Sequence, residues 1–196
     1  LRALELLGII KTVPGGGNYI ADDLDSWLIG PLSILFKLNN GYIRQTQQLR
    51  AALEREMAIL AARKCTPLDA AELWRILSSI DKAEDEKTRG ELDKELHTQI
   101  AKIADNPMIY SVLAAADKLT ENIIAGTRDY IMKKNRPEFK VDEQHRLLVE
   151  AIINNDEKGA EQYMSEHMEI IEKCMDEMQK NSNNKRPANG IVMGGE

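Results

Sequence analysis

The residues best suited to chemistry in this chain are its three histidines and an aspartate near the first of them. Asp93 and His97 stand four residues apart, so both project from one face of the helix predicted there. His145 and His167 each lie on or beside the apolar stripe of a later predicted helix. Three imidazoles and a carboxylate on inward helix faces form a donor set that suits a divalent transition metal.

The same four residues also allow a purely structural interpretation, because a single helical histidine is most often hydrogen-bonded locally in or beside the core. Three facing helices could instead bring all four side chains to the centre of a bundle, where buried polar groups need partners. One divalent ion would satisfy them together. Spacing alone leaves both interpretations open.

The donor types narrow which ion such a site would hold. Imidazole nitrogen disfavours Ca²⁺ and Mg²⁺, which prefer oxygen ligands. We expect Zn²⁺ first, with Ni²⁺, Co²⁺, Mn²⁺ or Fe²⁺ as alternatives. Four ligands could close a tetrahedral zinc site, whereas octahedral geometry leaves two positions for water or a bidentate carboxylate.

The elements that must position these side chains are helices. Aromatic residues make up only 5% of the chain, and Leu, Ile, Ala, Met, Glu and Lys recur throughout, which favours helix over strand. The pattern predicts an all-α fold, an antiparallel bundle of about six or seven helices. The predicted helices are 31–39, 42–64, 66–82, 87–104, 107–133, 142–154 and 157–181.

Local signals support these helix boundaries. Thr66-Pro67-Leu68-Asp69 combines a capping residue, a proline suited to the first helical position and an early carboxylate. Asp105-Asn106-Pro107 breaks the helix that contains His97. In the long helix 42–64, the stripe expected to face the core consists of Leu49, Leu53, Met57 and Leu60.

The front of the chain has a different pattern. Leu1, Leu4 and Leu7 have helical spacing, and two short extended runs then flank Pro14-Gly15-Gly16-Gly17. We expect the end of a helix and a hairpin over residues 1–22. The other predicted segments are a linker at 23–30, the helical domain at 31–181 and a disordered tail at 182–196.

Composition excludes several classes of protein. Hydrophobic residues at 43% and charged residues at 30% suit a globular chain and not a disordered one. The formal net charge of −6 argues against a general polyanion-binding protein. The longest apolar stretch, Trp27–Phe36, is too short to span a bilayer, and no signal peptide is recognised. We therefore expect a cytoplasmic protein without a membrane partner, with Cys65 and Cys174 reduced.

At the candidate metal ligands the sequence resembles the FadR branch of the GntR regulator superfamily, whose C-terminal helical domain is called FCD. Asp93–His97 is similar to the family's Asp-x-x-x-His motif, and Ala104–Pro107 to the helix break that follows it. Glu143–His145 resembles the next histidine motif. Ala151–His167 resembles the last, with Asn155 in place of the usual glycine. The resemblance extends to about residue 180.

The resemblance implies a homodimeric transcription regulator whose helical domain binds a divalent metal and a small organic acid effector that modulates DNA binding. The four residues above would match the family's four metal ligands, and the metal would also receive the effector's carboxylate. Arg50 and Arg128 are candidate effector-binding residues, because a guanidinium offers a carboxylate two parallel donors. For each of them the alternative is an arginine solvated on a charged helix face.

The resemblance also implies that the opening helix and hairpin are the end of a recognition helix and the wing of a winged helix-turn-helix. Arg2, Lys11, Gly15, Gly16 and Gly17 are then candidate DNA contacts, since glycines let a wing approach phosphates closely. An ordinary hairpin tip is the alternative. Because two complete helices precede such a wing, we expect operator DNA to be reached through a mostly missing N-terminal domain.

Two further functions stay open at this point. A metal-dependent enzyme acting on a small carboxylate or ester would activate water at an open metal position. No clear general base accompanies the ligands, although Glu91, Glu95 and Glu143 are near them in the sequence. A helical adaptor without a metal is the third interpretation.

Overall fold

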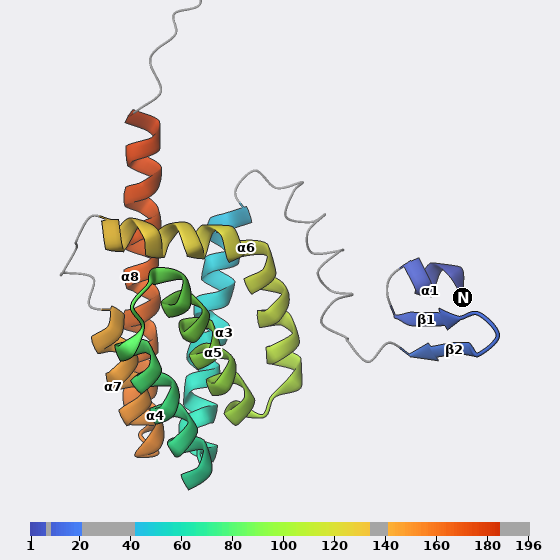
Figure 1. Ribbon diagram of the computed structural model, residues 1–196, viewed down its shortest axis with the longest axis horizontal. Helices are drawn as coiled ribbons and strands as arrows, with labels where there is room; N and C mark the ends of the chain where they lie inside the picture. Colours follow the sequence, from blue (N-terminus) through green and yellow to red (C-terminus); the bar gives the residue numbers. More distant parts are fainter. Residues whose placement is uncertain (7–8, 21–41, 134–140, 185–196) are drawn as a thin grey trace, which may run out of the picture.

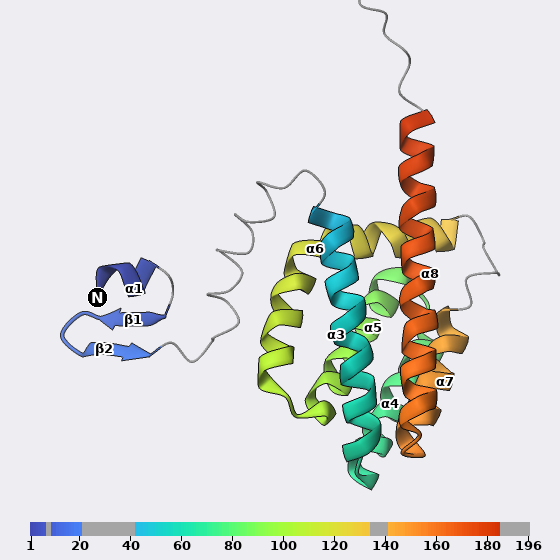
Figure 2. The same ribbon diagram turned by 180° about the vertical axis from the view of Figure 1, so that it is seen from behind.

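The computed structural model describes residues 1–6, 9–20, 42–133 and 141–184. Within them, six long helices form one bundle, seen from opposite sides in Figures 1 and 2. This confirms the predicted all-α fold. The helices are α3 (Tyr42–Lys64), α4 (Pro67–Lys82), α5 (Glu86–Ala104), α6 (Pro107–Lys133), α7 (Val141–Ile153) and α8 (Glu157–Asn184).

Helix α3 is the central element, because it contacts α5, α6, α7 and α8. Helix α4 closes the bundle against α5 and α7, and α7 also packs along α8. The interior between them is aliphatic, with Leu73, Ile76, Ile100, Leu148 and Ile152 almost inaccessible to solvent. Burying each such side chain contributes about 1.5–3 kcal/mol. This core fixes the helices whose polar side chains meet at the candidate site.

Side-chain caps begin the helices where the sequence predicts them. Thr66 accepts a hydrogen bond from the Asp69 amide, and the Asp69 carboxylate accepts one from the Thr66 amide, which makes a reciprocal capping box for α4. Asp85 caps α5 through the Thr88 amide. Asn106 accepts from the Ile109 amide at the start of α6. These caps satisfy backbone donors that a helix end leaves unpaired.

Helix α6 bends along its length, with one arm running beside α3 and the other crossing one end of the bundle (Figures 1 and 2). The buried Thr120 hydroxyl donates to the Ala116 carbonyl of the preceding turn at 2.9 Å. Such back-bonding by threonine often accompanies helix bending. The bend lets one helix contact α3, α5 and α8.

The N-terminal elements are α1 (Arg2–Leu6), β1 (Ile10–Val13) and β2 (Gly17–Ile20). The strands pair antiparallel with Ile10 opposite Ile20, as predicted for a hairpin. Gly15 in the turn and Gly17 at the start of β2 have φ angles of 76° and 100°, which glycine adopts without strain. Among the described residues, these three elements contact only each other.

Two sequence predictions need correction. Helix α8 continues to Asn184, so the tail predicted as disordered from residue 182 is wrong for its first three residues. The serine and asparagines at 182–184 have low helix propensity, but propensity is a weak predictor, and these residues continue a helix that is already formed. On α3, the buried stripe is offset from the predicted one: Met57 is buried, but Leu49, Leu53 and Leu60 are only half-buried.

Several predicted segments lie outside the described residues: the helix at 31–39, the linker at 23–30 and the tail from residue 185. Cys65 and Cys174 are both free, and Cys174 is buried whereas Cys65 is half-buried. In the part of the chain that the structure describes, no helix combines the length and apolar character needed to cross a bilayer.

Candidate metal centre

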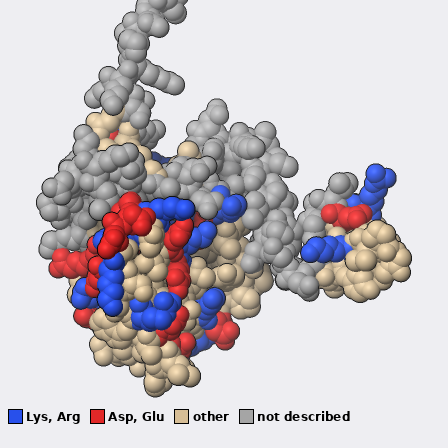
Figure 3. Space-filling view, in the orientation of Figure 1, with Lys and Arg blue, Asp and Glu red and all other residues tan. Residues whose placement is uncertain are grey.

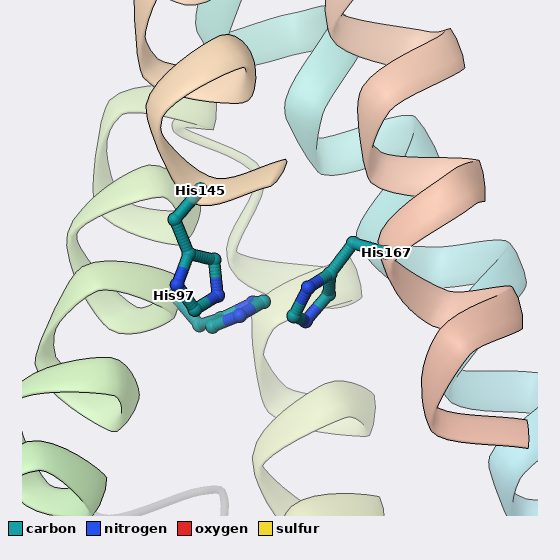
Figure 4. A group of neighbouring side chains, drawn as sticks. All are labelled: His97, His145 and His167. Carbon is teal, nitrogen blue, oxygen red and sulfur yellow. The ribbon is translucent and has the colours of Figure 1, made fainter. Parts of the chain in front are cut away.

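The three histidines come together in the interior of the bundle. His97 projects from α5, His145 from α7 and His167 from α8, and their rings point toward one another in Figure 4. The ring centroids are 4.6 Å apart for His145 and His167, 5.1 Å for His97 and His167, and 5.6 Å for His97 and His145. One ligand atom from each lies within 4.8 Å of the other two. The three inward-facing histidines therefore converge, which spacing alone had left open.

Asp93 lies beside this cluster, one turn before His97 on α5. Its Oδ1 is 3.0 Å from Nε2 of His145, so α5 and α7 also meet through this pair. The carboxylate is mostly buried, with 14% of its side chain exposed. All four predicted ligands thus occupy one region of the interior.

Several histidine nitrogens of the cluster make no hydrogen bond to the described residues. Within the described residues, Nδ1 of His145 and Nδ1 of His167 are buried without a hydrogen-bond partner, and Nε2 of His145 lies 3.0 Å from Oδ1 of Asp93 but is not aligned with it for a hydrogen bond. Burial and the neighbouring His145 and His97 hold the pKa of His167 well below its usual value, so this ring is neutral. Neutral imidazoles with unused lone pairs are what a metal ion requires of its ligands.

His97 has a partner that the sequence reasoning missed. Its Nδ1 contacts Oε2 of Glu54, a carboxylate of α3 that is 2% exposed. Burial raises the pKa of Glu54, but His97 and Arg50 outweigh it and lower the pKa to about 2. Burial likewise lowers the pKa of His97, but Glu54 and Asp93 raise it to about 9. Without a metal the two side chains therefore form a buried ion pair.

Arg50 stands behind Glu54 on α3 and is only 7% exposed, so it is not the solvated arginine of the alternative interpretation. Its Nη2 donates to Glu54 Oε1 at 2.7 Å and its Nη1 to Gln47 at 3.1 Å. Its Nε donates to the carboxylate of Asp117 on α6. Two carboxylates therefore already surround the guanidinium predicted to receive an effector.

A signal for this polar group exists in the sequence. Gln47, Arg50, Glu54, Met57 and Ala61 follow one another at spacings of three or four residues, and all five are buried. The charged positions continue the stripe that the apolar positions begin. A search for apolar residues alone passes over the first half of that stripe.

The other predicted site residues do not reach the cluster or cannot be placed. The side chain of Arg128 lies outside the described residues, although its backbone belongs to α6. Arg2 lies on α1 and Lys11 on β1, while Gly15 and Gly16 lie in the hairpin turn and Gly17 begins β2, and all five are exposed.

The donor set fits a transition metal. Nitrogen ligands of one tetrahedral zinc ion lie about 3.3 Å apart. The histidine nitrogens lie within 4.8 Å of one another, so rotation of the rings could bring them to the spacing that zinc requires. A buried cation would give the His145 and His167 nitrogens the partner that the protein does not supply. Asp93 would add a negative charge, as in other nitrogen- and oxygen-ligated sites.

The candidate general bases of an enzyme do not accompany this site. Glu95 pairs with Arg75 of α4 at the surface, and Glu91 and Glu143 are exposed.

The face of the bundle in Figure 3 shows acidic and basic side chains closely mixed. No continuous basic surface is seen on the part of that face that is described. Exposed ion pairs such as Arg75 with Glu95 join acidic and basic side chains at the surface of the bundle.

Comparison with known proteins identifies the domain. A model of the FCD domain matches residues 45–170. YcbG of Bacillus subtilis, an HTH-type transcriptional regulator, is 29% identical over 87% of this chain and 69% of its own length. A putative L-lactate dehydrogenase operon regulatory protein of Escherichia coli is 23% identical, over 89% of this chain and 69% of its own length.

Solved structures agree on the fold. GntR of Streptococcus agalactiae superposes with a TM-score of 0.65 at 23% identity, covering 88% of this chain and 78% of that one. These relatives are named as regulators, which favours the regulator over the enzyme and the adaptor. The FadR branch stays a prediction. The FCD match includes His97, His145 and His167, and this chain belongs to the FCD-domain family, in which the relatives above are named as transcriptional regulators.

Proposed function

We propose that helices α3–α8 form a sensor domain that binds one divalent transition-metal ion and a small organic acid, and that the acid adjusts the affinity of the regulator for operator DNA. The observation behind this proposal is the convergence of three buried histidines from three helices, with buried nitrogens that lack a hydrogen-bond partner in the described region. A purely structural core has little reason to bury such nitrogens together.

The ligands are His97, His145, His167 and Asp93. Three imidazoles and one carboxylate favour Zn²⁺, with Ni²⁺, Co²⁺, Mn²⁺ and Fe²⁺ as alternatives. When bound, the ion supplies positive charge that ties α5, α7 and α8 together. It also attracts the carboxylate of an effector.

The effector is a small carboxylic acid. The buried guanidinium of Arg50 is complementary to a carboxylate in charge and in hydrogen-bond donors. Asp117 and Glu54 already accept its hydrogen bonds. A carboxylate that reaches Arg50 therefore replaces Asp117, whose side chain is 35% exposed and the more accessible of the two. Arg128 stays a second candidate. L-lactate is the first acid to test, because one relative is named for an L-lactate dehydrogenase operon.

DNA binding belongs to the N-terminal part of the regulator, and the domain acts as a homodimer in the cytoplasm. The hairpin of β1 and β2 is the proposed wing, with Lys11, Arg2 and its turn glycines, Gly15–Gly17, as phosphate contacts. Its two short strands are mostly exposed and carry Lys11 as their basic side chain, beside the exposed Val13, Tyr19 and Ile20. Light scattering of the purified protein measures the expected dimer mass.

Thermal unfolding of the chelator-treated protein tests the metal and acid together. Zn²⁺ is expected to raise the melting temperature as its concentration rises above Kd, because a ligand that binds only the folded state stabilises it by mass action. L-lactate is expected to raise it further when Zn²⁺ is present. Mg²⁺ serves as the control ion and should have no effect. If neither Zn²⁺ nor Ni²⁺ changes the melting temperature, the proposal is wrong.

A further inference from the structure

A buried carboxylate beside the cluster is not among the four proposed ligands. Glu54 belongs to α3, whereas Asp93, His97, His145 and His167 belong to α5, α7 and α8. Its two oxygens have different partners: Oε2 contacts Nδ1 of His97, and Oε1 accepts from Nη2 of Arg50 at 2.7 Å. Only 3% of the Glu54 side chain is exposed, so water does not compete for these contacts.

We propose that Glu54 is a positioning residue of the metal centre, which accepts the Nδ1–H of His97 and thereby leaves Nε2 as the nitrogen that binds the metal. This inference rests on the proposed function, since it names a supporting residue for the same site. A histidine ligand commonly donates its second ring N–H to a carboxylate, which fixes the tautomer and the orientation of the ring. The Glu54–His97 contact supplies that arrangement across α3 and α5.

Arg50 keeps Glu54 in place. A lone buried carboxylate is unfavourable, and the Arg50 guanidinium offsets its charge while fixing Oε1. The same guanidinium also binds Asp117 on α6 and Gln47 on α3. The metal centre is therefore connected through His97, Glu54 and Arg50 to a carboxylate of the bent helix α6.

Substitution of Glu54 separates positioning from simple ion pairing. Glu54→Gln keeps the size of the side chain but removes the charge, and its amide can turn a donor toward His97. The matched control is Glu56→Gln, an exposed glutamate of the same helix. Zinc affinity is measured on the full chain by competition with a chromophoric chelator. We expect Glu54→Gln to weaken zinc binding by about 10–100-fold and Glu56→Gln to leave it unchanged.

Nuclear magnetic resonance of the histidine rings gives a readout that stability does not move. In the zinc-loaded wild-type protein, His97 should have its proton on Nδ1 and its metal on Nε2. Circular dichroism checks the fold of each variant. If Glu54→Gln does not fold, Glu54→Asp replaces it, because the shorter side chain keeps a charge near Arg50 but withdraws it from His97. The same loss of affinity is expected.

The outcomes distinguish this inference from the proposed function. If the wild type binds zinc and Glu54→Gln binds it equally well, or if His97 coordinates through Nδ1, Glu54 does not position the ligand while the metal centre stands. If the wild type binds neither zinc nor nickel, the metal centre is wrong and the positioning role is wrong with it. Weaker binding with a changed His97 tautomer supports both.

Discussion

The two halves of helix α3 bury side chains of opposite character on one continuous face. The first half buries Thr46, Gln47, Arg50 and Glu54, and the second half buries Met57, Ala58, Ala61 and Ala62. Both halves pack within the same bundle and differ only in what they meet. The first half lies against His97 and Asp117, whereas Met57 and the alanines belong to the aliphatic core.

This difference indicates that the second half of α3 contributes mainly to stability. Aliphatic burial is favourable without further conditions. Burying the two charges of an ion pair carries a large desolvation penalty, which their mutual attraction must first offset. Well-packed apolar residues of similar volume often stabilise a fold as well or better. Arg50 and Glu54 are therefore poorly explained by stability alone. Glu54 contacts His97 and Arg50 binds Glu54, which fits the supporting role that we propose for this pair in the metal centre.

The largest effect on stability should come from the apolar half. Met57→Ala removes a side chain that is 1% exposed, and we expect a loss of about 2–5 kcal/mol in the free energy of unfolding. The loss should be similar with and without Zn²⁺, because no proposed ligand changes. Urea unfolding under both conditions measures it. Leu68→Ala, at a position 83% exposed, is the control and should change little.

The polar half should instead govern the response to metal. At a free Zn²⁺ concentration of 100 times Kd, the wild type is expected to gain about 2.7 kcal/mol of stability. His167→Ala should lose that gain, since it removes a ligand. Comparing unfolding with and without Zn²⁺ cancels any general effect of the substitution. Glu169→Gln, on the exposed side of α8, should respond like the wild type. An undiminished response of His167→Ala would contradict the ligand assignment.

A smaller effect is expected at the outer end of the polar group. Asp117→Asn removes the charge that occupies Arg50 but keeps the size of the side chain. If an effector carboxylate replaces Asp117, binding of L-lactate should tighten about fivefold, because a charge-assisted hydrogen bond exceeds a neutral one by about 1 kcal/mol. Isothermal titration of the zinc-loaded protein measures this. Unchanged or weaker binding would place the effector elsewhere, and Asp81→Asn, an exposed aspartate of α4, is the control.

Exposed ion pairs should matter least. Arg146 of α7 pairs with Asp81 of α4 at 3.0 Å, with about half of each side chain exposed. Arg146→Gln is expected to change the free energy of unfolding by less than about 1 kcal/mol, since water and salt screen such pairs. A larger loss in thermal or urea unfolding would show that this pair resembles the buried Arg50 group more than its exposure suggests.

The sequence predicted most of the bundle because its local signals agree. Thr66 and Asp69, and Asn106 with Pro107, mark helix starts that the structure confirms. It also predicted that Asp93, His97, His145 and His167 lie on inward faces. That these faces meet at one point came from the family resemblance, because spacing along a chain does not say which helices are neighbours.

Glu54 could not be recognised in the same way. Its role depends on α5 placing His97 against α3, a contact between residues 43 positions apart. The buried face of α3 was predicted from its leucines, and the face predicted in this way did not include Arg50 and Glu54. The spacing of Gln47, Arg50 and Glu54 is visible in the sequence, but their burial and the two carboxylate partners of the Arg50 guanidinium are seen only in the structure.

Native mass spectrometry of the chelator-treated protein during a zinc titration tests the central claim most directly. The account predicts one tightly held zinc ion per chain in the wild type and none in His145→Ala, since His145 is 1% exposed and lies within the cluster. A wild-type protein that takes up no zinc, or a His145→Ala variant that retains one ion per chain with equal affinity, would contradict it.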